Sequence, residues 1–107
     1  MVGRRRRLSW TEAARSALQE AAGHIAADSP VAAQNFVERI ISAASSLETL
    51  SERGRVVPEL GDLSIRELIV PPFRLIYQVG EGDVFILTLL HEARDFARWQ
   101  TGSSSEG

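Results

Sequence analysis

The chain has 107 residues, of which 44% are hydrophobic and 24% charged, and its formal net charge is −2. These values are typical of one soluble globular domain that can fold around its own core. Cysteine is absent, which excludes disulfides, thiolate nucleophiles and cysteine-based zinc sites. All 12 basic residues are arginine, so no lysine can act as a general base or form a Schiff base.

The N-terminal run Arg4–Arg7 is not followed by the apolar segment of a signal peptide, and no apolar stretch approaches the ~20 residues of a membrane span. We therefore expect a cytoplasmic protein that does not contact a membrane. The arginine run has two interpretations. It contacts nucleic acid or an acidic partner, or it is a solvated leader or an edge strand protected by charge. We favour the second.

The first half of the chain predicts a short strand followed by two helices. Residues 4–10 can form a strand that ends with Leu8 and Trp10 on one face. Ser9 or Thr11 then offers an N-cap for a helix over residues 11–27, where apolar residues recur at helical spacing.

The tripeptide Asp28-Ser29-Pro30 predicts the end of the first helix and the start of the second. Ser29 suits an N-cap and Pro30 the first helical position of a helix over residues 30–50. Two long helices joined by so short a break must fold back as an antiparallel hairpin.

The second half predicts strands over residues 65–70, 73–79 and 84–91. Pro71-Pro72 separates the first two, and a tight loop over residues 80–83 separates the last two. We expect the last strand to be central and covered on both faces. The predicted fold is α+β: an N-terminal strand, the antiparallel helical hairpin, a three-stranded antiparallel sheet packed on one side by that hairpin, and a short C-terminal helix near residues 92–99.

The domain is expected to span residues 1–101. Residues 102–107, Gly-Ser-Ser-Ser-Glu-Gly, form a predicted flexible tail without packing residues. Trp10, Phe36 and Tyr77 fall in periodic apolar patterns, which predicts that they lie in the core.

Several ordered motifs resemble the RelE/ParE toxin superfamily, and ParE-type toxins most of all. The resemblance spans roughly residues 8–96. Its motifs are Ile-Ala-Ala-Asp-Ser-Pro-Val-Ala-Ala at 25–33, Pro-Glu-Leu-Gly at 58–61, Ile-Arg-Glu-Leu at 65–68, Phe-Arg-Leu-Ile-Tyr at 73–77 and Leu-Leu-His-Glu-Ala-Arg-Asp at 89–95.

The resemblance implies the toxin of a type II toxin–antitoxin system, without a cofactor or metal. A ParE-like toxin would inhibit DNA gyrase without being an enzyme. A cognate ParD-like antitoxin would neutralise it in a toxin–antitoxin hetero-oligomer. The alternative is a RelE/YoeB-like endoribonuclease that cuts mRNA on the ribosome. In RelE, lysines and arginines perform the cleavage, so the absence of lysine weakens that alternative.

A YoeB-type mechanism could instead use Glu67 as base, Arg74 as phosphate clamp and His91 as acid, if neighbouring strands bring them onto one sheet surface. Each residue also has a structural interpretation. Arg74 can lie on the solvent side of the sheet, Glu67 can be its salt-bridge partner, and His91 can be a hydrogen-bonded edge residue. His24 is expected at the surface, and two histidines so far apart do not suggest a zinc site.

The segment after the last predicted strand combines aromatic and arginine side chains, which suits a protein contact. In ParE-like toxins the C-terminal end is implicated in toxicity, so we expect the target to be contacted there and on the neighbouring strands. The alternative is that the two aromatic residues only cover the end of the sheet. The expected target-binding residues are Arg66, Arg74, His91, Arg94, Phe96, Arg98 and Trp99.

Overall fold

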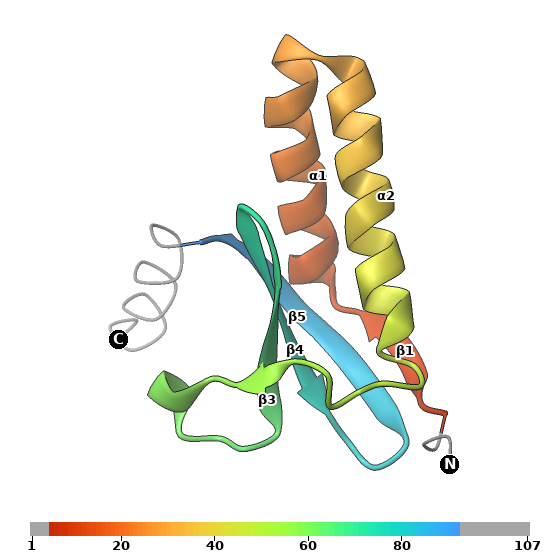
Figure 1. Ribbon diagram of the computed structural model, residues 1–107, viewed down its shortest axis with the longest axis vertical. Coiled ribbons are helices and arrows are strands. Elements are labelled where there is room, and N and C mark those ends of the chain that lie inside the picture. Colours follow the sequence, from red (N-terminus) through yellow and green to blue (C-terminus); the bar gives the residue numbers. More distant parts are fainter. Residues whose placement is uncertain (1–4, 93–107) are drawn as a thin grey trace.

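The computed structural model describes residues 5–92 of the chain. Figure 1 shows a helical hairpin standing beside a twisted sheet. The elements in chain order are β1 (Arg7–Trp10), α1 (Glu12–Asp28), α2 (Pro30–Ser46), β2 (Arg55–Val56), the 3₁₀ turn η1 (Pro58–Leu60), β3 (Ile65–Val70), β4 (Phe73–Val79) and β5 (Asp83–His91).

The strands form one five-stranded mixed sheet in the order β1-β5-β4-β3-β2. The predicted three-stranded antiparallel unit is present as β3, β4 and β5. The sheet is nevertheless mixed and larger than the predicted three-stranded unit, because β1 pairs parallel to β5 and β2 adds a further edge strand. The helical hairpin supplies the long crossover that a parallel pair requires. With two residues, β2 is too short to give a periodic pattern in the sequence.

Both helix starts confirm the capping predictions. The Thr11 hydroxyl accepts a hydrogen bond from the backbone N–H of Ala14, and the Ser29 hydroxyl accepts one from Ala32. Pro30 occupies the start of α2, where its missing N–H costs nothing. The helices pack as the expected antiparallel hairpin (Figure 1). However, α2 ends at Ser46 rather than at the predicted Leu50, because the chain turns there.

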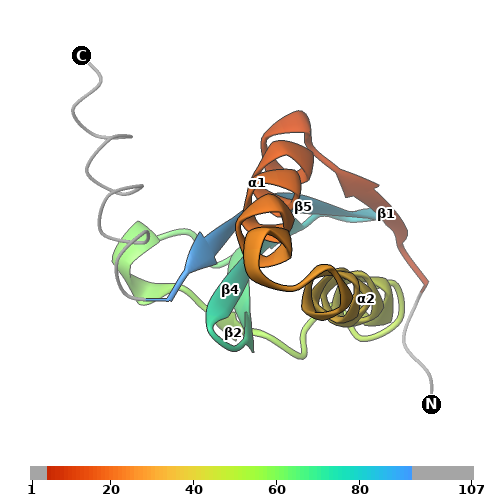
Figure 2. The ribbon, with the colours of Figure 1, turned by 90° about the horizontal axis from the view of Figure 1, so that it is seen from above.

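The main core lies between the helical hairpin and one face of the sheet, which we call the helical face (Figure 2). Phe36 and Tyr77 are buried in it and Trp10 packs against it, which confirms the three core predictions. The buried members from both layers are Ala14, Phe36, Ile40, Ala44, Leu47, Val70, Leu75, Tyr77, Val84, Ile86 and Leu89.

The opposite face, which we call the open face, carries a smaller buried cluster of Val57, Ile76 and Leu90, with Leu60, Ile65 and Leu87 partly buried against it. The strand β5 is therefore interior, as expected. It is not covered on both faces along its whole length, because Phe85 is 38% exposed. Within residues 5–92, no helix is long and apolar enough to cross a membrane.

Candidate functional site

Arg55, Glu67 and Arg74 gather on the open face of the sheet. Side chains directly opposite each other in a strand pair lie on the same face. Glu67 is opposite both Arg55 on β2 and the open-face residue Ile76 on β4. Arg74 is opposite Leu90, which belongs to the same open-face cluster. Three neighbouring strands therefore bring these charged side chains together away from the helices.

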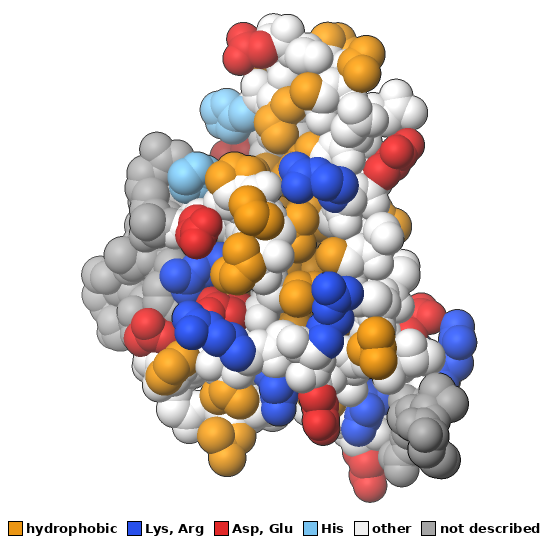
Figure 3. Space-filling view, in the orientation of Figure 1, with side chains coloured by type: hydrophobic (Ala, Val, Ile, Leu, Met, Phe, Trp, Pro, Cys, Tyr) orange, Lys and Arg blue, Asp and Glu red, His pale blue; other side chains and the backbone are white. Residues whose placement is uncertain are grey.

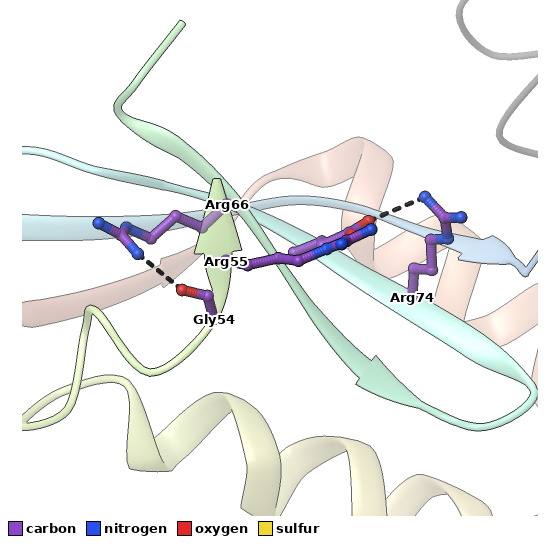
Figure 4. Close-up of polar contacts among 5 residues, drawn as sticks. Gly54, Arg55, Arg66 and Arg74 are labelled. Atoms are coloured by element: carbon purple, nitrogen blue, oxygen red, sulfur yellow. Dashed lines mark hydrogen bonds and ion pairs between the residues drawn. The ribbon is translucent and has the colours of Figure 1, made fainter. Parts of the chain in front are cut away.

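The Glu67 carboxylate is the centre of this cluster, with a side chain only 1% exposed. Its Oε1 accepts a hydrogen bond from Arg74 Nη1 at 2.8 Å, and its Oε2 accepts one from Arg55 Nε at 2.5 Å. In Figure 4 the Arg55 side chain extends toward Arg74. The predicted ion pair between Glu67 and Arg74 is confirmed. A buried carboxylate needs such partners, since a single uncompensated charge in this place would be costly.

The two arginines differ in their exposure. The Arg74 side chain is 18% exposed, and that of Arg55 is 71% exposed. The hydrogen bond to Glu67, and then the Glu67 charge, raise the pKa of Arg55, with a smaller contribution from the charge of Glu59. Access of a substrate hydroxyl to Glu67 is restricted, because the side chain is 1% exposed and each carboxylate oxygen already accepts a charge-assisted hydrogen bond.

His91 lies on the helical face, so the hypothesis that Glu67, Arg74 and His91 share one sheet surface is wrong. His91 is opposite Phe73, and their rings meet edge to face with centroids 5.5 Å apart. Phe73 in turn packs against Phe36 of α2, at 5.1 Å between centroids. This places His91 beside the main core, across the sheet from Glu67.

An irregularity in the sheet explains the position of His91. The register between β4 and β5 shifts between Ile76 and Tyr77, so that Ile76 pairs with Thr88 while Tyr77 pairs with Ile86. One extra residue in a strand reverses the face of every side chain beyond it. Strict alternation from Ile86 would have placed His91 on the open face.

Arg66, which was predicted to contact a target together with Arg74, does not share a face of the sheet with it. It precedes Glu67 in β3 and therefore lies on the other face of the sheet. Its Nη1 donates to the Gly54 carbonyl at 2.6 Å, so this guanidinium holds the segment between α2 and β2 (Figure 4). The structure thus gives Arg66 a role in the fold, whether or not it also contacts a target.

Tyr77 also holds the segment between α2 and β2 in place. The Tyr77 hydroxyl donates to the Ser51 carbonyl and accepts from the Gly54 N–H, both at 2.9 Å. Burial raises the pKa of this hydroxyl, although the hydrogen bond from Gly54 opposes the shift. A Cβ on Gly54 would lie 2.5 Å from the Glu67 carbonyl oxygen and 2.6 Å from the Tyr77 hydroxyl, so the close approach requires glycine.

At the N-terminus, Arg5 and Arg6 contact other parts of the fold. Arg5 pairs with Glu48 at 2.9 Å, and Arg6 donates to the Gly80 carbonyl and the Ser51 hydroxyl. Arg6 is therefore part of the fold rather than of a solvated leader, whereas the Arg5 side chain is 73% exposed. The predicted edge position is present, since β1 is at one edge of the sheet with Arg7 exposed, and protection of that edge by charge stays a prediction.

The remaining predicted site residues, Arg94, Phe96, Arg98 and Trp99, lie outside the described residues, as do Arg4 and most of the predicted C-terminal helix. His24 is exposed on α1, as expected. Residues 5–92 contain no group of three or more His, Cys, Asp or Glu side chains that could hold a metal ion.

The described surface also has an open hollow of about 600 Å³ at the end of the sheet near the β4–β5 loop. Its lining residues are Arg6, Thr49, Leu50, Ser51, Glu52, Arg53 and Glu81. Arg74 and Leu90 pair near the other end of β4 and β5, so the hollow is separate from the Arg74 side of the cluster. In Figure 3, arginines spread across the sheet half of the visible face with acidic side chains among them.

A family model for the ParE toxin of the parDE type II toxin–antitoxin system matches residues 8–96. The chain belongs to the ParE toxin family. The ParE-family chain is also 40% identical over 86 residues to Toxin RelE2 of Caulobacter vibrioides, covering 79% of this chain and 93% of that relative.

Two solved structures resemble this ParE-family chain. One is a chain of the chromosomal ParDE system from P. aeruginosa, with a TM-score of 0.68 and 22% identity over 80% of this chain and 95% of that one. The other belongs to the toxin–antitoxin complex RelBE2 from Mycobacterium tuberculosis, with a TM-score of 0.55 and 21% identity over 84% of this chain and 94% of that one. At these identities the likeness shows a shared fold. Relatives bear both ParE and RelE names, so the resemblance to the RelE/ParE superfamily is confirmed. The names do not decide between gyrase and the ribosome as the target.

One member of the charged cluster was missed by sequence reasoning. Arg55 lies in Ser51-Glu52-Arg53-Gly54-Arg55, which looks like a polar end to the helical hairpin. The feature that points to Arg55 is the close approach of its neighbour Gly54 to the sheet. This approach can be recognised only once the positions of Tyr77 and Glu67 are known.

Proposed function

We propose that this ParE-family toxin acts on DNA gyrase by binding rather than by catalysis. The observation that supports this most directly is the separation of Glu67 from His91 by the sheet, together with the engagement of both Glu67 oxygens by arginine. A base and an acid for RNA cleavage would have to act around one phosphodiester. A toxin that grips a macromolecular complex needs only a surface.

We further propose that a cognate ParD-like antitoxin neutralises the toxin in a hetero-oligomer in the cytoplasm. Figure 3 shows hydrophobic side chains along the seam between the helical hairpin and the sheet, where an amphipathic helix could lie. The edge of β3 beyond the short β2 offers backbone groups to an added strand. The titles of the two similar structures describe a ParDE system and a RelBE2 complex, which supports this kind of partner.

The proposal is tested by adding the purified chain to gyrase in supercoiling and DNA-cleavage assays. We expect loss of supercoiling and accumulation of cleaved DNA, both reversed by the antitoxin encoded beside the toxin gene. Ribosome-bound mRNA should stay intact at the same toxin concentration. Cleaved mRNA with undisturbed gyrase would refute the proposal.

The second candidate is a ribosome-dependent endoribonuclease, for which the sequence suggested Glu67, Arg74 and His91 although the sheet separates His91 from the other two. It is favoured by the RelE2 name of the relative with 40% identity. Replacing each residue singly by alanine and inducing the variants in cells separates the candidates, provided that the variants accumulate as folded protein. Retained growth arrest in all three would remove the enzyme.

The residues proposed to contact the target are Arg66, Arg74, His91, Arg94, Phe96, Arg98 and Trp99. We expect F96A and W99A to reduce gyrase inhibition more than H24A, a change at an exposed residue of α1. Equal inhibition by all three variants would exclude a contact through the two aromatic residues.

A further inference from the structure

We propose that Arg55 contacts the phosphodiester backbone of a nucleic acid, and that Glu67 is a positioning residue that orients Arg55 for this contact. The proposal extends the proposed function, since DNA on gyrase and mRNA on the ribosome both supply such a backbone. It assigns a role to a residue that the sequence motifs do not mark, and gives Glu67 a role other than that of a base.

The first argument is the way in which Arg55 is held. Glu67 binds Nε, the inner nitrogen of the guanidinium, at 2.5 Å. The two terminal nitrogens are therefore at the outer end of a side chain that is 71% exposed. A guanidinium that is already oriented loses less conformational freedom when its terminal N–H groups bind the oxygens of an anion.

The second argument concerns charge. Glu67 has one negative charge and two arginine partners. The three side chains of the cluster therefore carry a net positive charge. Glu59 is close enough to raise the pKa of Arg55, but it is exposed, so water and salt screen its effect.

The third argument concerns the surroundings on the open face. Phe85, which is 38% exposed, is opposite Gln78, and Ile69, which is 42% exposed, is opposite Arg74. An exposed aromatic ring on the same face as an arginine suits a single-stranded nucleic acid, whose bases stack on the ring while its phosphates meet the cation. A carboxylate on a partner protein would bind the same guanidinium but would not need that ring.

The test measures binding of the purified chain to labelled single-stranded DNA and RNA of the same sequence by fluorescence anisotropy, across a series of salt concentrations. We expect R55Q to weaken binding about 5-fold and to lower the slope of log affinity against log salt by about 0.7, as for one lost phosphate contact. R55K keeps the positive charge but loses the paired terminal N–H groups of the guanidinium, so its affinity should lie between those of wild type and R55Q. R15Q, the same change at an exposed arginine of α1, should bind like wild type.

The variant E67Q separates positioning from simple electrostatics. Removing a negative charge should tighten binding of an anion if only net charge matters. If Glu67 orients Arg55, E67Q should bind more weakly, and the E67Q/R55Q double variant should bind no more weakly than R55Q alone. Circular dichroism and thermal unfolding of each variant show whether it is folded. If E67Q is unfolded, R55Q and R55K against R15Q still decide whether Arg55 makes the contact.

Each outcome has a defined meaning. Tighter binding by folded E67Q, or equal binding by R55Q and R15Q, overturns the proposal. So does a wild-type chain that binds neither oligonucleotide, or one that binds an acidic peptide with the same dependence on Arg55. None of these results would disturb a positive gyrase assay, so the two proposals can fail separately. A preference for DNA or for RNA tells which source supplies the phosphate.

Discussion

The two faces of the sheet are built differently. The helical face has eleven buried hydrophobic residues, which come from both helices, from Leu47 just after α2 and from β3, β4 and β5. The open face has three buried apolar residues and, beside them, a buried carboxylate held by two arginines. Stability therefore comes mainly from the face that the helices cover, and the cluster of Arg55, Glu67 and Arg74 lies on the face that they leave free.

The boundary between the faces is set by a local irregularity rather than by the alternation of residue types. The shift between Ile76 and Tyr77 moves Leu89 and His91 onto the helical face. It places Leu89 rather than Leu90 in the main core and removes the histidine from the neighbourhood of Glu67. A single extra residue in β5 thus decides which side chains can act together.

The comparison predicts that equivalent cavities cost more on the helical face. I86A should lower the free energy of unfolding by about 4 kcal/mol, because the surrounding core is packed from both layers and cannot close over the gap. I76A, also fully buried but in the smaller cluster, should cost about 2 kcal/mol. Urea unfolding measures both. Equal losses would mean that the open face is as tightly packed as the helical one.

A second prediction concerns the segment that crosses the edge between the faces. G54A should lower the free energy of unfolding by about 3 kcal/mol, since the new Cβ would collide with the Glu67 backbone and the Tyr77 ring. The matched control is G23A in α1, where a Cβ meets nothing within 4 Å. That variant should be more stable by about 0.8 kcal/mol, from helix propensity. A tolerated G54A would show that the approach is looser than the structure has it.

Tyr77 connects the main core to this segment, and its ionisation gives a pH test. Burial raises the pKa of Tyr77 in the folded state. The contribution of its hydroxyl to the free energy of unfolding is therefore fully present below the ordinary tyrosine pKa of about 10, and it is lost as the pH rises through the higher folded value. Y77F should cost about 1.5 kcal/mol at pH 8 by removing two hydrogen bonds.

Urea unfolding at pH 8 and pH 11 measures the effect. Wild type should lose more stability than Y77F over this interval, so the difference between them should shrink as the pH rises. A constant difference would show that the Tyr77 hydroxyl does not ionise at a different pH in the folded and unfolded chain.

Local signals made much of the fold predictable. The caps at Thr11 and Ser29, the break at Pro71-Pro72 and the alternation over residues 73–79 depend on neighbouring residues alone, and the structure has each of them. The direction of β1 and the existence of β2 depend on partners 76 and 12 residues away, in pairs such as Ser9–Phe85 and Arg55–Glu67, and no local pattern reports them.

The candidate site was predictable only in part, for the same reason. Glu67 and Arg74 are close in sequence on adjacent strands, so their pairing follows from the hairpin. The position of His91 depends on a bulge, and that of Arg55 on a loop anchored by Tyr77 and Arg66. These are tertiary features, and residue types along the chain do not reveal them.

The smallest expected effect is at the edge of the sheet farthest from the charged cluster. The Arg5–Glu48 pair is 2.9 Å long, but its side chains are 73% and 31% exposed. Water and salt screen such a pair, so R5A should cost no more than about 0.5 kcal/mol. The loss should vanish in 1 M salt, because the interaction is electrostatic.

R6A is the contrasting variant, since Arg6 is partly buried and bonds to the Gly80 carbonyl and the Ser51 hydroxyl. Its loss should be larger and should persist in salt. If R5A lowers the free energy of unfolding more than R6A does, the exposed Arg5 contributes more to stability than the partly buried Arg6. Burial would then not decide how much an arginine contributes at this edge.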